Sequence, residues 1–233
     1  MGTMIEFARP DGGHCRGYFA DAGKERPAVI VIQEWWGLNE QICGIADRFA
    51  AAGFSALAPD LFQGRVAQNP DEASHLMNGL DFPGATHQDI RGAARHLAAL
   101  GGALHAGDSA SRAGKVGVTG YCMGGALTIA AAVHVPEIAA AVCLYGIPPR
   151  DFADPANIRV PFQGHFATQD DWCTPEAVAE LEARMRAHGA APEVFHYNAA
   201  HAFCNEKRPE VYDAKCAAEA WTRTLAFFGK HLQ

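Results

Sequence analysis

Residues 118–125, VTGYCMGG, constrain the fold more than any other segment of the chain. A short, mostly apolar run, Lys115–Val118, leads into them, and small residues that can begin a helix follow. Glycines two positions before and two positions after Cys122 allow the backbone to turn sharply from a strand into a helix. Such a turn exposes the middle side chain at the helix N-terminus, where backbone N–H groups point toward an acyl adduct. That residue is usually serine, so the cysteine here predicts a thiol nucleophile.

Length and composition indicate one globular domain of ordinary charge. The chain has 233 residues, 49% of them apolar, and shows no linker, repeat or low-complexity tract, so we expect a single domain over residues 1–233. The formal net charge of −7 argues against a nucleic-acid or anionic-membrane partner. No apolar stretch is long enough to span a bilayer, and the first residues lack the features of a signal peptide.

The cysteines indicate a reducing compartment. They are odd in number and lack the spacing of a disulfide framework, so we expect free thiols and a cytoplasmic location. The seven are Cys15, Cys43, Cys122, Cys143, Cys173, Cys204 and Cys216. Neither a Cys-x-x-Cys pair nor a His-Glu-x-x-His motif is present, so no metal and no cofactor are expected.

Apolar strand-like runs alternate with helical segments along most of the chain. The expected strands are 28–33, 54–58, 115–119, 138–145, 160–167 and 193–197, and the expected helices are 39–52, 85–100, 123–133, 175–188 and 209–228. Residues 3–20 are expected to add an antiparallel hairpin or edge strand, and residues 61–83 an irregular segment with a short helix at 71–78. This alternation predicts an α/β fold, a doubly wound, mostly parallel sheet flanked by helices on both faces, with its ligand site at the carboxyl ends of the strands.

Acyl transfer by a thiol also needs a base and a group that orients the base. In enzymes with this strand–turn–helix nucleophile, the acid follows the nucleophile in the chain and the histidine comes last. Asp170 and Asp171 follow one predicted strand, and His201 follows the last one, so all three fall in the required order at strand ends. His165 and His196 lie inside predicted strands and are expected to be core or face residues.

A second carboxylate, Glu34, directly follows the first predicted parallel strand, in the segment QEWWG. We expect it near the thiol, where Trp35 and Trp36 would desolvate it and raise its pKa. The alternative is a helix-capping or surface glutamate. The two tryptophans are either cover for the core or the walls of a pocket for an aromatic or conjugated substrate.

Together, the segments QEWWG and GYCMGG, the aspartate loop TQDDWCTPE and the sequence HAF resemble the dienelactone hydrolases. The resemblance runs over essentially the whole chain and implies an α/β-hydrolase fold with Cys122, Asp170 and His201 as the catalytic triad. Asp170 is preferred to Asp171 because the family pattern places an aromatic residue two positions after the aspartate and a proline five positions after it. Glu34 matches the family's extra carboxylate, which holds the resting thiol and helps to deprotonate it when substrate arrives.

The same resemblance assigns roles around the triad. The backbone N–H groups of Met123 and Trp35 would form the oxyanion hole. Tyr145 aligns with an active-site tyrosine of the family, although a core role is equally compatible. The side chains expected to contact substrate are Trp36, Tyr145, Phe203 and Arg208.

The chain departs from the family at the groups that bind the substrate carboxylate. Members specialised for dienelactone carry arginines that clamp it, because a guanidinium fork matches the two carboxylate oxygens. One such arginine lies a few residues after the catalytic histidine, where this chain has Asn205, with Lys207 and Arg208 nearby. The other is expected in the segment 61–83, where the sole arginine is Arg65. The sequence therefore predicts the reaction type more closely than the substrate.

A cysteine nucleophile restricts the ester. A thiolate leaves more readily than an alkoxide, so the tetrahedral intermediate goes forward only when the other leaving group is an enolate, a phenolate or a similarly good one. We expect hydrolysis of a small activated ester, foremost an enol lactone of the dienelactone type, through a thioester in aromatic compound degradation. The alternatives are a broader aryl esterase or thioesterase, an oxidised-thiol sensor, and a silent ligand-binding protein. We expect a monomer or a small homo-oligomer.

Overall fold

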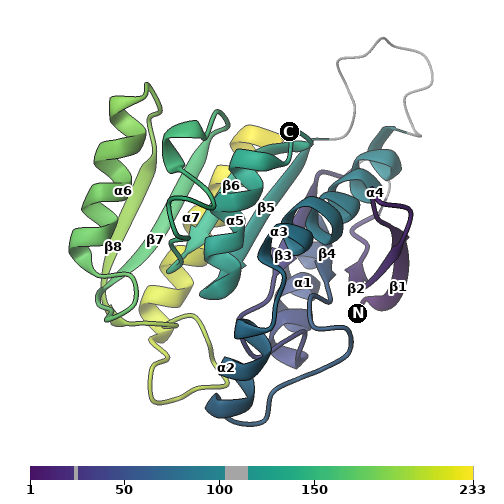
Figure 1. Cartoon of the computed structure of the whole chain (residues 1–233), viewed down its shortest axis with the longest axis horizontal. Helices are drawn as coiled ribbons and strands as arrows, with labels where there is room; N and C mark the ends of the chain where they lie inside the picture. The colour runs from purple at the N-terminus through teal and green to yellow at the C-terminus, as the bar shows by residue number, and fades with distance from the viewer. Residues whose placement is uncertain (24–25, 103–114, 233) are drawn as a thin grey trace.

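A single eight-stranded sheet forms the centre of the computed structural model, which describes residues 1–23, 26–102 and 115–232 (Figure 1). The strand order is β1-β2-β4-β3-β5-β6-β7-β8. The strands are β1 (Thr3–Ala8), β2 (His14–Ala20), β3 (Ala28–Ile32), β4 (Ser55–Pro59), β5 (Val116–Tyr121), β6 (Ile138–Leu144), β7 (Phe162–Gln169) and β8 (Glu193–Ala200). The expected N-terminal hairpin is present as β1 and β2, and β2 also pairs antiparallel with β4. All other neighbours are parallel, which confirms the mostly parallel sheet.

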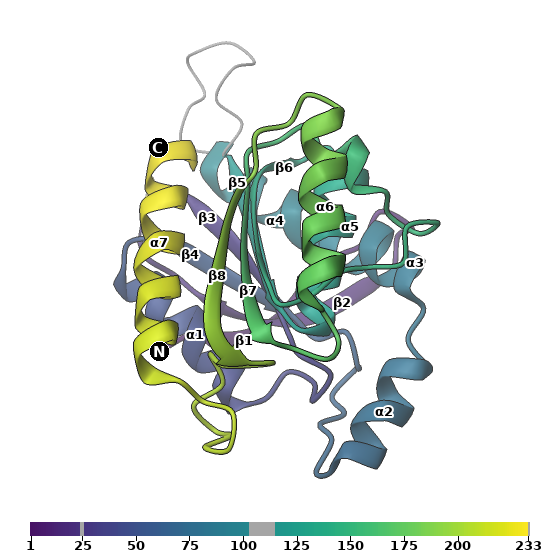
Figure 2. The same ribbon diagram turned by 90° about the vertical axis from the view of Figure 1, so that its left-hand side faces the viewer.

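Helices cover both faces of this sheet. They are α1 (Glu40–Ala51), α2 (Pro70–Asn78), α3 (Phe82–Gly84), the π-helical turn η1 (Ala85–Ile90), α4 (Arg91–Gly102), α5 (Met123–His134), the 3-10 turn η2 (Pro155–Asn157), α6 (Pro175–Ala187) and α7 (Ala214–Leu232). Figure 2 shows α1 and α7 on one face and α4, α5 and α6 on the other. Each face has its own buried apolar cluster, with Phe49 and Phe228 on the first and Leu97, Leu127 and Val178 on the second. No helix in these described segments is long and apolar enough to cross a membrane.

Local sequence signals account for most element boundaries. All five residues of β3, AVIVI, are buried, as expected for a central strand that is covered on both faces. Asn39 caps α1 by accepting a hydrogen bond from the Ile42 N–H at 3.1 Å. Thr174 caps α6 in the same way, and Pro175 occupies the first turn, where it costs no helical hydrogen bond.

Two helix predictions need correction. The predicted helix 85–100 begins with the π-helical turn η1 and becomes regular at Arg91. The predicted helix 209–228 begins only at Ala214, because the preceding residues form turns on the Arg208 carbonyl and Asp213 then caps the helix by accepting from the Cys216 N–H at 2.9 Å. The late start leaves the segment after His201 free to fold over the carboxyl ends of the strands.

The turn at Cys122 joins β5 directly to α5 and packs closely against its surroundings. Cys122 has a φ of 56°, a conformation that costs a non-glycine residue about 1–3 kcal/mol. The backbone around the turn is packed so closely that it has no room to relax. A Cβ atom added to any of four glycines would lie within 2.1–2.5 Å of a backbone oxygen; these are Gly120, Gly124, Gly125 and Gly146. These positions admit only glycine.

We predict that Gly124→Ala destabilises the protein by about 1–3 kcal/mol or more, because the added methyl group would overlap the Ile32 and Gln33 carbonyl oxygens, both 2.5 Å away. The measurement is urea-induced unfolding. Gly44→Ala, in the open middle of α1, is the matched control and is expected to stabilise by up to about 1 kcal/mol. Equal effects of the two substitutions would contradict the close packing of the turn.

Candidate active site

Five neighbouring strands of the sheet each end next to one polar or nucleophilic residue. In sheet order these are Glu34 after β3, Cys122 after β5, Tyr145 after β6, Asp170 after β7 and His201 after β8. Because the five strands are parallel, their carboxyl ends meet at one edge, which is the lower edge of the sheet in Figure 1. Residues that are 167 positions apart in the chain are therefore gathered at one site.

Asp170 and His201 form a close hydrogen-bonded pair. The imidazole Nδ1 of His201 lies 2.7 Å from Oδ2 of Asp170. The other carboxylate oxygen accepts from the backbone N–H groups of Trp172 at 2.8 Å and Cys173 at 2.9 Å. Burial opposes ionisation of Asp170, but the bonds to His201 and to these amides outweigh it and lower its pKa. The neighbouring Asp171 is exposed, so the structure brings Asp170 to the histidine.

His201 favours its protonated form in this setting. Burial lowers the pKa of a histidine, but the hydrogen bonds and charges of Asp170 and Cys122 outweigh that effect and raise the pKa of His201 to about 10. Cys122 is therefore close enough to the imidazole to influence its protonation, although the thiol is only partly buried. The arrangement suits an imidazole that holds the proton of the thiol.

Glu34 is buried with neutral partners. Its side chain is 2% exposed, Oε2 accepts from the Asn205 amide at 2.7 Å, and Oε1 lies 3.5 Å from the Tyr145 hydroxyl. Burial raises its pKa, as the sequence led us to expect, although Asn205, His201 and Arg208 act against the shift. Among the described residues Glu34 makes no hydrogen bond to Cys122, so the resting contact that the family resemblance implied is replaced by the contact with Asn205.

The two backbone N–H groups that the resemblance assigned to the oxyanion hole, those of Met123 and Trp35, are without an acceptor in the described segments. Met123 is the first residue of α5, so its N–H has no partner inside the helix. The Trp35 N–H also lacks a partner, while the turn after it is closed by the Gly37 N–H on the Glu34 carbonyl at 3.3 Å. Donors of this kind stabilise a developing oxyanion if both point at the same position.

Comparison with known families identifies the family that the sequence resembles. The sequence profile of the dienelactone hydrolase family matches residues 15–232, which is nearly the whole chain. The chain belongs to the dienelactone hydrolase family. As a member it is a carboxylic ester hydrolase with the α/β-hydrolase fold, and both of these sequence predictions are confirmed.

Individual relatives match over their full lengths. The chain is 38% identical to "Protein usf" of Aquifex pyrophilus and 34% identical to a "Putative carboxymethylenebutenolidase" of Aquifex aeolicus, in both cases over 100% of each chain. The crystal structure of a "Putative Dienelactone Hydrolase" from Klebsiella pneumoniae is 28% identical, with a TM-score of 0.80 over 99% of this chain and 100% of that one.

Three tryptophans form a chain of ring contacts that reaches His201. The Trp35 ring lies 5.4 Å from the Trp36 ring and 6.2 Å from the Trp172 ring, and Trp172 lies 6.4 Å from the His201 ring. Trp172 is 69% exposed, the largest exposure of any described aromatic side chain. The sequence analysis did not assign it to the pocket, although its position two residues after Asp170 was a usable signal.

The remaining predicted contact residues divide into buried and accessible ones. Tyr145 and Phe203 are both 0% exposed, and their rings pack 5.4 Å apart, so Phe203 presents no surface to a ligand. The Arg208 guanidinium lies 5.7 Å from the Trp36 ring and pairs with Glu210 at 2.8 Å. Trp36 and Arg208 therefore lie at the rim of the site, and Tyr145 lies beneath it.

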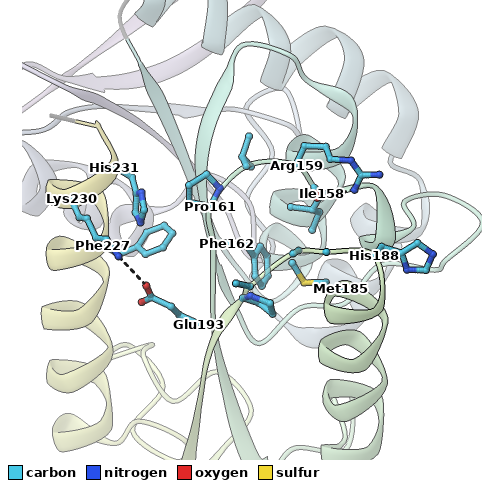
Figure 3. Close-up of a pocket in the computed structure, with 15 residues that line it drawn as sticks. Ile158, Arg159, Pro161, Phe162, Met185, His188, Glu193, Phe227, Lys230 and His231 are labelled. Atoms are coloured by element: carbon cyan, nitrogen blue, oxygen red, sulfur yellow. Dashed lines mark hydrogen bonds and ion pairs between the residues drawn. The ribbon is translucent and has the colours of Figure 1, made fainter.

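A separate cavity lies away from this site. The cavity in Figure 3, of about 400 Å³, lies between the ends of α6 and α7 and is lined by residues such as Pro161 and Glu193, which precede β7 or begin β8. It therefore lies at the opposite edge of the sheet from Cys122. No cluster of three or more potential metal ligands occurs in the described residues.

We predict that His201 titrates far above the ordinary histidine value of about 6.5. Because the folded-state pKa of about 10 exceeds the unfolded value, its charged form stabilises the fold fully below about pH 6.5, and that contribution is lost as the pH rises through 10. The measurement is an NMR titration of the His201 imidazole, with unfolding of wild type and His201→Gln compared from pH 6 to pH 10. Asp170→Asn should lower the pKa of His201, whereas Asp171→Asn should leave it near the wild-type value. Equal titration in both variants would contradict the pairing.

Proposed function

We propose that the protein hydrolyses activated carboxylic esters through a thioester on Cys122, with enol lactones of the dienelactone type as the leading substrate class. The observation that carries the proposal is the order of Cys122, Asp170 and His201 on β5, β7 and β8, together with the 2.7 Å hydrogen bond between Asp170 and His201. The relatives named carboxymethylenebutenolidase support the leading substrate class.

In the first half of the reaction, the thiol of Cys122 gives its proton to His201 and the sulfur attacks the ester carbonyl carbon. The oxygen becomes an oxyanion, which the N–H groups of Met123 and Trp35 stabilise. The C–O bond to the leaving group then breaks, His201 returns the proton to the departing oxygen, and a thioester on Cys122 is left. Asp170 orients the imidazole throughout and stabilises its charged form.

In the second half, His201 takes a proton from water, and the hydroxide attacks the thioester carbonyl carbon. The C–S bond breaks, the carboxylic acid product is released, and His201 returns the proton to the Cys122 sulfur. In a lactone the leaving oxygen remains joined to the acyl group, so one ring-opened acid is the single product. The nucleophile and the base are then back in their starting states.

The thiol accounts for the restriction to activated esters. When the leaving group is an enolate or phenolate, the tetrahedral intermediate expels it in preference to the thiolate, whereas an alkoxide or amine would leave more slowly than the sulfur. Thioesters also meet this condition, so a broader aryl esterase or thioesterase is the second candidate. The exposed Trp172 beside His201 favours the aryl ester among these, since an aromatic ring can stack on it.

We predict that Cys122→Ala lowers kcat/KM for 4-nitrophenyl acetate and for the enol lactone 4-carboxymethylenebut-2-en-4-olide by about 10³-fold or more, because no thioester can form. Asp170→Asn should lower kcat by about 10³–10⁴-fold, since the imidazole loses its orienting partner. The rates are followed by absorbance under initial-rate conditions.

Cys216→Ala is the control for the loss of a thiol, because Cys216 lies in the first turn of α7 and has no role in the proposed reaction, and it should hydrolyse both esters at the wild-type rate. Wild-type rates in Cys122→Ala would rule out the thioester route. Hydrolysis of the aryl ester without the lactone would support the second candidate.

We also predict that iodoacetamide at pH 7 modifies Cys122 first and that activity is lost in proportion. Burial raises the pKa of the other six thiols, to about 11 for Cys43 and about 12 for Cys143, so they contain little of the reactive thiolate at this pH. The measurement is peptide mass spectrometry over time. Slow, uniform labelling of all seven thiols would instead favour a silent ligand-binding protein.

A further inference from the structure

Trp172 presents an exposed aromatic ring beside the proposed catalytic base. The side chain is 69% exposed, and its ring lies 6.4 Å from the His201 ring and 6.2 Å from the Trp35 ring. Trp35 is itself half-buried. Together the two indole rings provide an apolar surface next to the imidazole that activates the second nucleophile of the proposed reaction.

The imidazole of His201 has one nitrogen free for that nucleophile. Nδ1 is hydrogen-bonded to Asp170 at 2.7 Å, so Nε2 is the atom that takes the proton. The His201 side chain is 19% exposed, so part of it is open to molecules from solvent. The nucleophile is therefore selected by what is held beside the imidazole, and the Trp172 ring is a surface that holds aromatic groups.

An aryl ester vacates this surface halfway through the reaction. Its phenol departs when the thioester forms, and the ring that was stacked on Trp172 departs with it. The second nucleophile attacks from the side of the departed group, because His201 serves both steps. A molecule that carries both an aromatic ring and a hydroxyl group therefore competes with water for this place.

A thioester on Cys122 makes transfer to an alcohol productive. When an alcohol attacks the thioester, the tetrahedral intermediate expels the thiolate in preference to the alkoxide, so an alkyl ester forms. The same preference makes the reverse reaction slow, because an intermediate formed by attack of Cys122 on an alkyl ester expels the sulfur again. The alkyl ester therefore accumulates.

From this arrangement we propose a second activity, in which the protein transfers the acyl group of an aryl ester to primary alcohols that carry an aromatic ring and bind on Trp172. His201 takes the proton of the alcohol, and the alcohol oxygen bonds to the thioester carbonyl carbon. The C–S bond then breaks, His201 returns the proton to the Cys122 sulfur, and the alkyl ester is released. The inference rests on the thioester reaction proposed above.

The test measures how the acyl-enzyme divides between water and an alcohol. The substrate is 4-nitrophenyl acetate, supplied with equal concentrations of either 2-phenylethanol or 2-cyclohexylethanol, which are similar in size and differ in aromaticity. Absorbance of 4-nitrophenol reports all acyl-enzyme formed, and chromatography gives the ratio of alkyl acetate to acetate. For the wild type we expect this ratio to be about two- to tenfold larger with the aromatic alcohol, since aromatic rings attract one another.

Variants at position 172 connect the ratio to the indole ring. Trp172→Ala should remove the preference for the aromatic alcohol, and Trp172→Phe should retain it. Both variants keep the backbone N–H that binds Asp170. Because both products come from one acyl-enzyme, the ratio is unaffected by a change in the rate of acylation or in the amount of folded protein. Tyr212→Ala, which removes an aromatic side chain that is 38% exposed elsewhere, is the control and should keep the wild-type ratio.

The outcomes separate this inference from the hydrolysis on which it rests. Release of 4-nitrophenol that depends on Cys122, with acetate as the sole acyl product, would overturn the transfer and leave the hydrolysis intact. Equal ratios for the two alcohols, or a preference that Trp172→Ala retains, would overturn the assignment of the alcohol site to Trp172. Release of 4-nitrophenol at the wild-type rate by Cys122→Ala would overturn both proposals.

Discussion

The close packing of the turn at Cys122 is the constraint on which the site depends. The turn touches the backbone at the carboxyl ends of β3 and β6, because Gly124 lies against the Gln33 carbonyl and Gly125 against the Leu144 carbonyl. The same contacts hold Cys122 at a positive φ and leave the Met123 N–H at the open end of α5. The position of Cys122 is thus set by backbone geometry and not by contacts of its own side chain.

Backbone strain in the described chain is concentrated at this edge of the sheet. Of its four non-glycine residues with positive φ, Cys122, Tyr145 and Ala202 lie next to the ends of β5, β6 and β8. Each costs about 1–3 kcal/mol, which the buried clusters on the two faces of the sheet offset. Rigid strands therefore hold thiol, tyrosine and histidine in orientations that a flexible loop would not maintain.

Local patterns in the sequence were sufficient for the strands, for most of the helices and for the turn at Cys122, because burial on both faces and glycine spacing are short-range signals. The choice between Asp170 and Asp171 needed the family resemblance, since only tertiary contact separates a buried carboxylate from its exposed neighbour. The bond between Glu34 and Asn205 joins residues 171 positions apart, and no local pattern specifies such a pair. The start of α7 was misplaced because the Asp213 cap competes with residues that have good helix propensity.

The way in which Asp170 is held has a consequence for the divergence of such enzymes. One of its oxygens is fixed by the backbone N–H of residue 172, whereas the Trp172 side chain points to solvent at the rim of the site. Every amino acid except proline supplies that N–H. The side chain at position 172 can therefore change from one descendant to another while the orientation of Asp170 is preserved, so that the rim of the site and the position of the carboxylate can evolve separately.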